Sequence, residues 1–492
     1  MAHWLRDRGY EAFAVRGGVP ALVPDSFQVP QRPLPLVGEQ QLQQQQQQQQ
    51  GLARARALGA LRYPLFRRYS AGVLLSLTGN WVEAAAFGYV VLLLGGSAAT
   101  LGLIGFLNSI PNLVFGLPAG ALADRYDRRK LIFLFQGANM IVAALLAVLW
   151  ATGTLSVLTM GALAVAGGTF GTLSFPAFQG MLASTVPKED LESAVAVNSL
   201  SLQVARFLGP AISGYLLASA GPTAVFSVNA GSFLAVLGTV ALLPRSRALA
   251  VGAASRLGGA MSEGVRYVFA SRSMASLMVL MIFAGLFATP PVAFMIPGIV
   301  RFQLDAGAST LGLLLAFIGL GSVLGSIALL ALSRRPNKGE PALIAYFATA
   351  IAIAAIGAST SIPLSFGLAV VGGLSGVLFI GISTVVVQAM SSEEMRARAM
   401  AVWAAAFVGM LPIGALITAG LAAWLGAGGA VLVDGLATLA GGVLVLLVRP
   451  EVTWLGCAAL PEACVAATDP LAVAFEPEPA LAAAVGAPTE RA

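Results

Sequence analysis

Charged residues are scarce in this sequence, at 10% of its 492 residues. A water-soluble domain carries roughly 25% charged residues, so an ordinary soluble enzyme is excluded. Only one histidine, His3, and two cysteines, Cys457 and Cys464, occur. Histidine acid–base chemistry and metal sites built from histidine or paired cysteine are therefore excluded, and no catalytic residue, metal ligand or cofactor is predicted. The sequence also lacks a G-x-x-x-x-G-K-[ST] phosphate loop, so ATP-driven transport by this chain is not expected.

Apolar residues dominate instead, at 58% of the chain with a mean hydropathy of +0.85. About 20 apolar residues in a helix span the hydrocarbon core of a membrane. The first half has six such stretches, at 69–94, 100–123, 131–150, 155–183, 191–219 and 222–243. The second half has six more, at 274–299, 308–332, 341–358, 362–390, 398–424 and 427–448. We therefore predict an all-α polytopic membrane protein of about 12 transmembrane helices in two six-helix pseudo-repeats.

The predicted organisation has five parts. Residues 1–65 form a disordered cytoplasmic leader with the glutamine run Gln43–Gln50, and 449–492 form a disordered cytoplasmic tail. Between them lie a six-helix bundle at 66–243, a cytoplasmic connector at 244–273 and a second bundle at 274–448. Within the leader, His3–Gly18 resembles the last helix and strand of a rhodanese-like sulfurtransferase domain, as a truncated relic or by chance. No cysteine precedes it, so sulfurtransferase activity is not expected.

Arginine and lysine occupy alternate connectors between the predicted spans. They occur at 125–130, 188, 245–272, 334–338 and 396–398, whereas connectors such as Gly95–Thr100 and Gly426–Gly429 are uncharged, with Arg301 the exception. Because cytoplasmic connectors are enriched in arginine and lysine, both termini are predicted to be cytoplasmic. The net charge of +6 then reflects topology, and nucleic acid is not an expected partner.

The two halves also resemble each other. Ser97–Leu103 recurs as Gly307–Leu313, and Ala196–Pro210 aligns with Ala401–Ala415. At that offset Asn229 stands opposite Asp434. A transporter built from two structural repeats has this pattern.

One connector carries a specific motif. Gly120–Lys130 reads GALADRYDRRK, which resembles the cytoplasmic signature loop of the major facilitator superfamily, G-x-L-A-D-R-x-G-R-[RK]. Asp127 stands at the usual glycine and, like glycine, tolerates a left-handed turn better than most residues. The resemblance extends over nearly all of 66–448 to the enterobactin-exporter-like branch, the transmembrane secretion effectors. It is carried by TGNW at Thr78–Trp81, FPAFQGML at Phe175–Leu182 and ARFLGPAISG at Ala205–Gly214.

The resemblance implies the major facilitator fold and a secondary active transporter in the plasma membrane, the inner membrane of a bacterium. Its expected function is export of a small amphiphilic molecule, such as a siderophore, drug or metabolite, by proton antiport with alternating access. The expected partners are this substrate, protons and the lipid bilayer, and a monomer is expected. Two alternatives stay open: a uniporter or uptake carrier without proton coupling, and a non-transporting membrane scaffold.

The signature loop predicts a gate at the cytoplasmic end. Asp124 can accept hydrogen bonds from a facing helix or guanidinium, and the resemblance places its partner at the start of the eleventh span, where Arg396 and Arg398 lie. Such contacts can form and break as the two bundles move. The alternative is that the charged loop residues only fix topology and meet lipid headgroups. The predicted gating-loop residues are Gly120, Asp124, Arg125, Arg128 and Arg129.

In the fifth span, Gly209, Pro210 and Gly214 resemble the helix-kink motif of antiporter branches, with Ser213 at one expected glycine. Small residues permit close helix approach, and proline kinks a helix. The motif favours export, but ordinary helix packing explains the same residues.

Two charged residues are predicted to lie in mid-membrane. Glu83 is about 14 residues into the first span and Arg206 about 15 residues into the fifth, so both lie near 21 to 23 Å deep at about 1.5 Å per residue. Charges at that depth are costly unless they are paired or face water. We predict that Glu83 is a protonatable group coupled to Arg206 and to substrate, the alternative being a permanent structural ion pair. Asn80, at a position where the branch often has aspartate, is a further candidate for proton coupling or substrate binding. Asp434 in the last span is expected to have a structural role.

Overall fold

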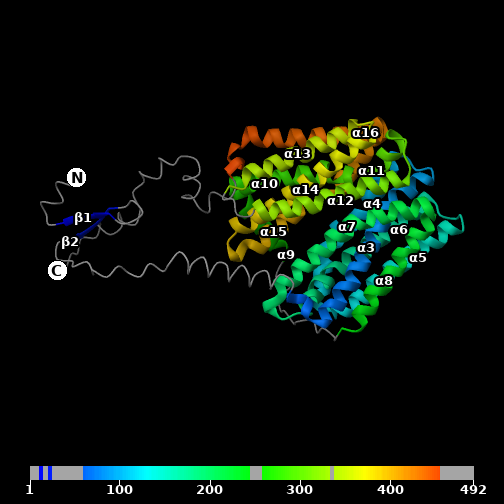
Figure 1. The fold of residues 1–492 in the computed structure, drawn as a ribbon, viewed down its shortest axis with the longest axis horizontal. Helices are drawn as coiled ribbons and strands as arrows, with labels where there is room; N and C mark the ends of the chain where they lie inside the picture. The colour runs from blue at the N-terminus through cyan, green and yellow to red at the C-terminus, as the bar shows by residue number, and fades with distance from the viewer. Residues whose placement is uncertain (1–9, 15–19, 25–58, 244–256, 333–336, 455–492) are drawn as a thin grey trace. The chain divides into compact units, whose positions relative to one another are not determined.

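The computed structural model describes residues 10–14, 20–24, 59–243, 257–332 and 337–454. They fall into two units, within residues 1–58 and 59–492. The first unit contains an antiparallel pair of strands, β1 (Tyr10–Ala14) and β2 (Pro20–Pro24), with Ala12 opposite Leu22. The second unit is helical and contains both predicted bundles (Figure 1).

Six long helices form the first bundle, and polar residues mark where several of them begin. Ser97 caps α4 by accepting a hydrogen bond from the Thr100 N–H, and Ser156 caps α6 in the same way through Thr159. Asp127 caps α5 through the Arg129 N–H. The helices are α3 (Pro64–Leu93), α4 (Ala98–Arg125), α5 (Arg128–Ala151), α6 (Val157–Ala183), α7 (Leu191–Ser219) and α8 (Gly221–Ala241), with short turns η1 (Gly59–Arg62) and η2 (Lys188–Asp190).

The seventh span is irregular because it contains three prolines, at 290, 291 and 297. Proline has no N–H to donate and clashes with the preceding turn, so the hydrogen-bonding pattern widens to five residues in places, as from the Thr289 N–H to the Ala284 carbonyl. The span consists of α10 (Arg272–Phe283), η3 (Ala284–Ala288), η4 (Pro291–Met295), α11 (Ile296–Gly298) and η5 (Ile299–Gln303).

The remaining helices complete the second bundle. They are α12 (Ala308–Leu332), α13 (Gly339–Ala358), α14 (Ile362–Met390), α15 (Glu393–Phe407) and α16 (Leu411–Val448), followed by η6 (Pro450–Trp454). Gly426 interrupts α16 with a φ of 71°, a left-handed value that suits glycine. The break falls at the predicted boundary between the last two spans.

By length and composition, ten helical stretches within the described residues are able to cross a membrane. The stretch Glu393–Val448 contains both of the last two predicted spans. Helix α3 is not in this set, since Asn80 and Glu83 lower the hydropathy of its middle turns. The prediction of an all-α polytopic membrane protein is confirmed.

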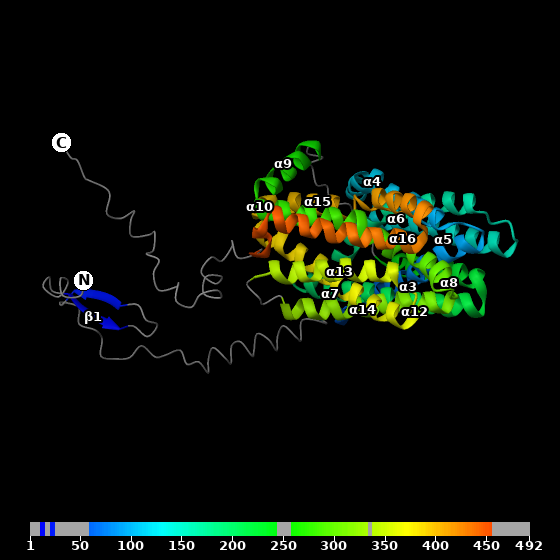
Figure 2. The ribbon, with the colours of Figure 1, turned by 90° about the horizontal axis from the view of Figure 1, so that it is seen from above.

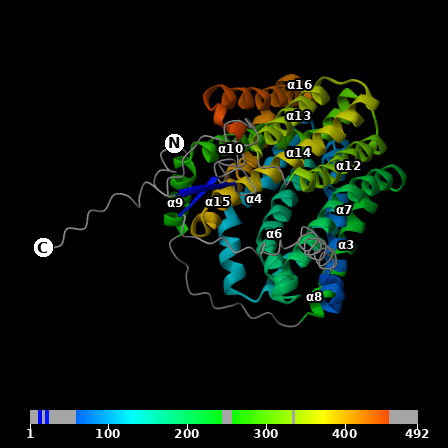
Figure 3. The ribbon, with the colours of Figure 1, turned by 60° about the vertical axis from the view of Figure 1, so that its left-hand side comes forward.

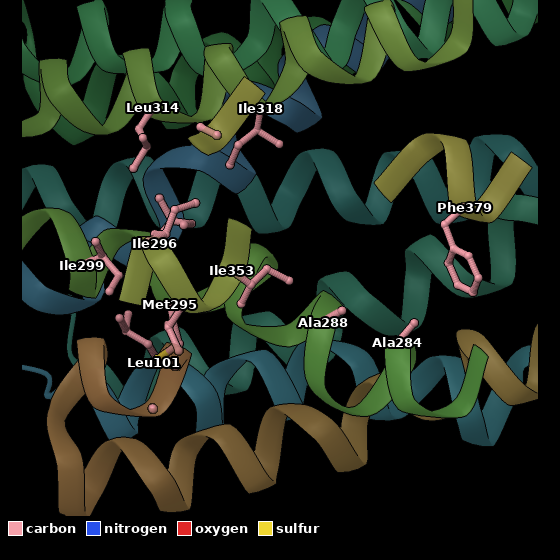
Figure 4. Packing of buried hydrophobic residues seen from close by; sticks show 14 of the residues in the cluster. Leu101, Ala284, Ala288, Met295, Ile296, Ile299, Leu314, Ile318, Ile353 and Phe379 are labelled. Atoms are coloured by element: carbon pink, nitrogen blue, oxygen red, sulfur yellow. The ribbon is translucent and has the colours of Figure 1, made fainter. Parts of the chain in front are cut away.

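Helices from both halves of the chain bury a common apolar core. Leu101 of α4, Ile296 and Ile299 of the seventh span, Leu314 of α12 and Ile353 of α13 belong to one cluster (Figure 4). Across the two halves, α7 packs against α12 (Figures 1 and 3), and α4 packs against α16. These two contacts are the most extensive between the bundles.

Three predicted segments outside the bundles contain more structure than expected. The leader was predicted to be disordered to residue 65, yet it contains β1 and β2, and the helical unit begins at Gly59. The connector contains α9 (Leu257–Ala270), which lies beside α10 and α15 (Figure 2). The tail begins with η6, whose Val452 is fully buried. The glutamine run and most of the tail lie outside the described residues.

Candidate functional site

A cavity of about 300 Å³ lies within the first bundle and reaches the seventh span. Its volume is at the lower end of the range for small-molecule sites, roughly 300–1,000 Å³. Helices α3, α4, α5, α6 and α8 contribute to it, together with Ala293, Phe294 and Pro297 from the irregular seventh span. Four asparagines and one carboxylate line it beside aromatic and aliphatic groups: Asn80, Glu83, Asn108, Asn139, Asn229, Phe87, Phe233 and Phe294.

Glu83 is held by the neighbouring helix α8. Its Oε2 accepts a hydrogen bond of 2.6 Å from Nδ2 of Asn229, and Ser232 donates to Oδ1 of Asn229 at 3.1 Å. This approach requires Gly79, because a Cβ there would lie 2.7 Å from Oδ1 of Asn229. The chain thus places a glycine one turn before the glutamate so that α8 can reach it.

The other asparagines give the cavity its mixed character. Asn108 donates to the Ala164 carbonyl at 3.4 Å, which ties α4 to α6. Asn80 of α3 also lines the cavity, and Phe294 closes its wall from the second half of the chain. Gly105 of α4 allows the Phe294 ring to pack closely against this helix, because a Cβ at position 105 would lie 2.5 Å from the ring. Such a surface suits an amphiphile, with an apolar body and a few hydrogen-bonding groups.

The predicted meeting of Glu83 and Arg206 does not occur in this structure. The guanidinium of Arg206 lies 5.4 Å from the centre of the Trp81 ring, and the one ion pair among the described residues joins Arg398 to Glu263. Residues two apart on a helix face directions about 200° apart. Trp81 therefore faces α7, while Glu83 faces α8. Glu83 and Arg206 both lie in the interior of their helices, but their side chains point to different neighbours.

The predicted gate residues are also separate here. Asp124 and Arg125 are exposed, and a Cβ on Gly120 would meet nothing within 4 Å. Arg398 Nη1 instead contacts Oε2 of Glu263 on α9 at 2.9 Å, and Arg396 Nε donates to the Gln388 carbonyl at 3.3 Å. The Asp124 contact with Arg396 or Arg398 is thus not made in this conformation.

The rest of the signature loop fastens the first bundle. Arg128 donates to the Gly180 carbonyl at 3.0 Å, and Arg129 donates to the carbonyls of Leu243 and Ala241 at 2.8 and 2.5 Å. Asp127 has a φ of −60°, so it serves as a helix cap and does not need the left-handed turn that its position suggests. These arginines therefore join helix ends within the bundle.

The three residues of the helix-kink motif lie where α7 approaches its neighbours most closely. Gly209 packs against Trp81 of α3, and a Cβ on Gly214 would lie 2.6 Å from the Cα of Gly312 on α12. Pro210 is buried between them. The motif provides close packing on both sides of α7 in this structure.

Sequence reasoning missed several contributors to the cavity, among them Asn139, Asn229 and Phe294. Asn229 had a usable signal, since it is a polar residue in the middle of an apolar span and aligns with Asp434 in the repeat. Phe294 had none, because an aromatic residue in an apolar span is ordinary. The candidate Asn80 lines the cavity, and Asn108 of α4 lines it as well.

Comparisons with known proteins agree with this architecture. The family described as transmembrane secretion effector matches residues 55–467. The chain is 25% identical over 378 residues to Multidrug efflux pump Tap of Mycolicibacterium fortuitum, covering 74% of this chain and 89% of that protein. It is 26% identical over 404 residues to Enterobactin exporter EntS of Escherichia coli O81 (strain ED1a), covering 79% and 92%.

A solved structure of the nucleoside transporter NupG matches with a TM-score of 0.63 at 13% identity, over 78% of this chain and 98% of that one. This likeness shows the fold, which is the one predicted. The family match covers most of the chain and includes both bundles. The chain therefore belongs to the transmembrane secretion effector family and is a multi-pass membrane transporter of the major facilitator superfamily.

Proposed function

We propose that this protein exports a small amphiphilic molecule by proton antiport, with alternating access between two bundles. The observation that carries the proposal is the cavity in which a carboxylate, Glu83, stands among asparagines and phenylalanines. Two relatives that match most of the chain are named as exporters, one of enterobactin and one of multiple drugs. A siderophore, a drug or a metabolite of similar chemistry fits this reading.

In the proposed mechanism, Glu83 takes up and releases the coupled proton. Asn229 donates a hydrogen bond to its carboxylate and holds it in the cavity, where an isolated charge within the bilayer is costly. Proton binding therefore changes the charge inside the cavity that also receives the substrate. Proton binding and substrate binding then influence each other, which is a simple basis for antiport.

The contacts between the bundles support alternating access. The bundles meet closely where Gly214 faces Gly312 and where Gly102 faces Ala419, a 2.6 Å approach for a Cβ in each case. We call the end of the bundles that carries the arginine-rich connectors the basic end, and Asp124 is exposed there. The close contacts between the bundles lie far from this end. With the basic end in the cytoplasm, as the charge pattern predicts, this is an inward-open arrangement. Asp124 and the arginines of α15 come together when that end closes.

The test is proton movement in inside-out vesicles with an acidified lumen, followed with a pH-sensitive dye. A panel of siderophores and antibiotics is added to wild type and to Glu83→Gln. We expect a compound that releases lumenal protons through wild type, and a reduction of at least about tenfold in Glu83→Gln, because glutamine keeps the hydrogen bond to Asn229 but carries no proton.

Glu340→Gln is the matched control, since it makes the same change at an exposed residue at the start of α13. It should behave as wild type. Compound flux that is equal in Glu83→Gln and wild type, without proton release, would establish the uniporter or uptake reading. An absence of flux for every compound would favour a scaffold.

A further inference from the structure

Arg206 is a cation in the middle of α7 with no carboxylate beside it. It lies 15 residues after the helix begins at Leu191, about 22 Å along a helix that rises about 1.5 Å per residue. Its side chain is half-buried, and among the described residues its guanidinium has the Trp81 ring as a neighbour but no ion pair. A charge at this depth is costly unless something balances it. One aromatic ring compensates only part of that cost.

The surroundings of Arg206 place it between the bundles. Gln203 lies three residues earlier, on the same face of α7, and its amide donates to Oγ of Ser326 on α12 at 2.8 Å. On α12, a Cβ at Gly319 would lie 3.0 Å from the Arg206 carbonyl. This face of α7 therefore meets the second bundle, while the Arg206 side chain extends to Trp81 of α3.

We propose that Arg206 binds an anionic group of the transported molecule. The substrate class is then an amphiphile that carries an anionic oxygen group, such as a carboxylate or a sulfonate. A planar guanidinium presents paired N–H donors that match such oxygens. The proposal rests on the export function proposed above and narrows its substrate.

The sequence predicted that Glu83 and Arg206 act together. In the present proposal Glu83 binds the proton and Arg206 binds the anionic group of the substrate. Glu83 faces α8 and the cavity, whereas the Arg206 side chain faces Trp81 of α3 and the Arg206 carbonyl faces α12. A proton at Glu83 and an anion at Arg206 thus occupy different sides of α3. Because the backbone of Arg206 packs against α12 of the second bundle, anion binding at Arg206 depends on how the bundles are arranged.

Binding of two fluorescent probes tests the proposal directly, with the full-length protein in lipid nanodiscs and empty nanodiscs subtracted. Anilinonaphthalene sulfonate and phenylnaphthylamine share a ring system, and only the first carries a sulfonate. Wild type should bind the sulfonate more tightly. Arg206→Gln should weaken sulfonate binding by about tenfold or more, the effect of losing hydrogen bonds to a charged group, while binding of the neutral probe changes less than about twofold.

Arg206→Lys should give an intermediate affinity, because an ammonium keeps the charge but lacks the paired donors; this variant also serves if Arg206→Gln does not fold. Arg301→Gln is the matched control, since it removes one positive charge at an exposed position, and it should bind both probes as wild type does.

The proposal is overturned if wild type shows no preference for the sulfonate, or if Arg206→Gln loses both probes equally. Because the assay needs no proton gradient, it separates this proposal from the export mechanism. A failure of proton coupling in vesicles leaves the binding result intact, and a failure of sulfonate preference leaves the vesicle result intact.

Discussion

At the scale of single residues, Asp434 is the buried carboxylate of the second bundle, at the position that aligns with Asn229 in the repeat. It is fully buried, its Oδ2 accepts a hydrogen bond of 2.7 Å from the Thr418 hydroxyl, and its Oδ1 has no hydrogen-bond partner among the residues that the structure describes. Thr418 and Asp434 lie on either side of the break at Gly426, so this bond joins the last two spans. The cavity that Glu83 lines does not include Asp434. We therefore assign it a structural role.

Substitution of Asp434 tests that assignment. Asp434→Asn should retain the melting temperature and transport, because an amide oxygen accepts the same hydrogen bond from Thr418. Asp434→Ala should lose about 1–3 kcal/mol of stability, since it leaves a buried hydroxyl unpaired and a small space unfilled. Thermal unfolding of the purified protein and vesicle transport give the two readouts. Loss of proton-coupled transport in Asp434→Asn at unchanged stability would instead make Asp434 part of the coupling machinery.

The helices that carry the buried charges could be predicted from the sequence, but the partners of these charges could not. Counting residues along each span predicts Glu83 and Arg206 near mid-membrane, and in the structure both lie in the interior of long helices, α3 and α7. Which neighbour each side chain meets depends on how α3 is rotated, and that is set by packing. Gly79 and Gly209 decide it, because they admit Asn229 on one side of α3 and bring Trp81 to α7 on the other.

At the scale of elements, helix boundaries followed the sequence closely, since Ser97, Ser156 and Gly426 mark them by capping and backbone preference. The seventh span was predicted only as an apolar stretch. The wide turns of this span follow from its prolines. Contacts with α3 and α4, which the sequence does not reveal, decide which of its side chains line the cavity, and Phe294 is one of these.

The α7–α12 contact provides a test of these close approaches. Gly312→Val should lower the transport rate severalfold or more, because its Cβ would lie 2.5 Å from the Cα of Gly214 and 2.8 Å from the Pro210 carbonyl. Backbone atoms cannot move aside as a side-chain end can, so the two helices must separate. Initial rates in vesicles, with expression verified, measure the effect.

Gly231→Val is the matched control on α8, since a Cβ at Gly231 would meet nothing within 4 Å. It should transport at close to the wild-type rate. Equal loss in both variants would mean that valine harms these helices in general, and normal transport by Gly312→Val would show that close approach of α7 and α12 is not required.

At the scale of the whole molecule, the bundles must separate at the end opposite the basic end, where they are in close contact, for a substrate to leave there. Gly88 of α3 and Pro297 of α11 mark this contact between bundles, with 3.5 Å between the Cβ that Gly88 would carry and the Cβ of Pro297. Cβ atoms joined by a disulfide lie about 3.5–4.5 Å apart. A Gly88→Cys, Pro297→Cys pair, with Cys457→Ser and Cys464→Ser to remove the native thiols, should therefore cross-link on oxidation without substrate.

The cross-link should stop transport, and a reductant should restore it, because a bond between α3 and α11 holds the bundles in the arrangement seen here. Each single cysteine variant, oxidised in the same way, controls for oxidation itself and for the loss of Pro297. Cross-linked protein that transports at the rate of these controls would contradict alternating access by separation of the bundles at this end. In that case the cavity around Glu83 must exchange its substrate by a path that leaves α3 and α11 together, and the exposed Asp124 would no longer be explained as half of an opened gate.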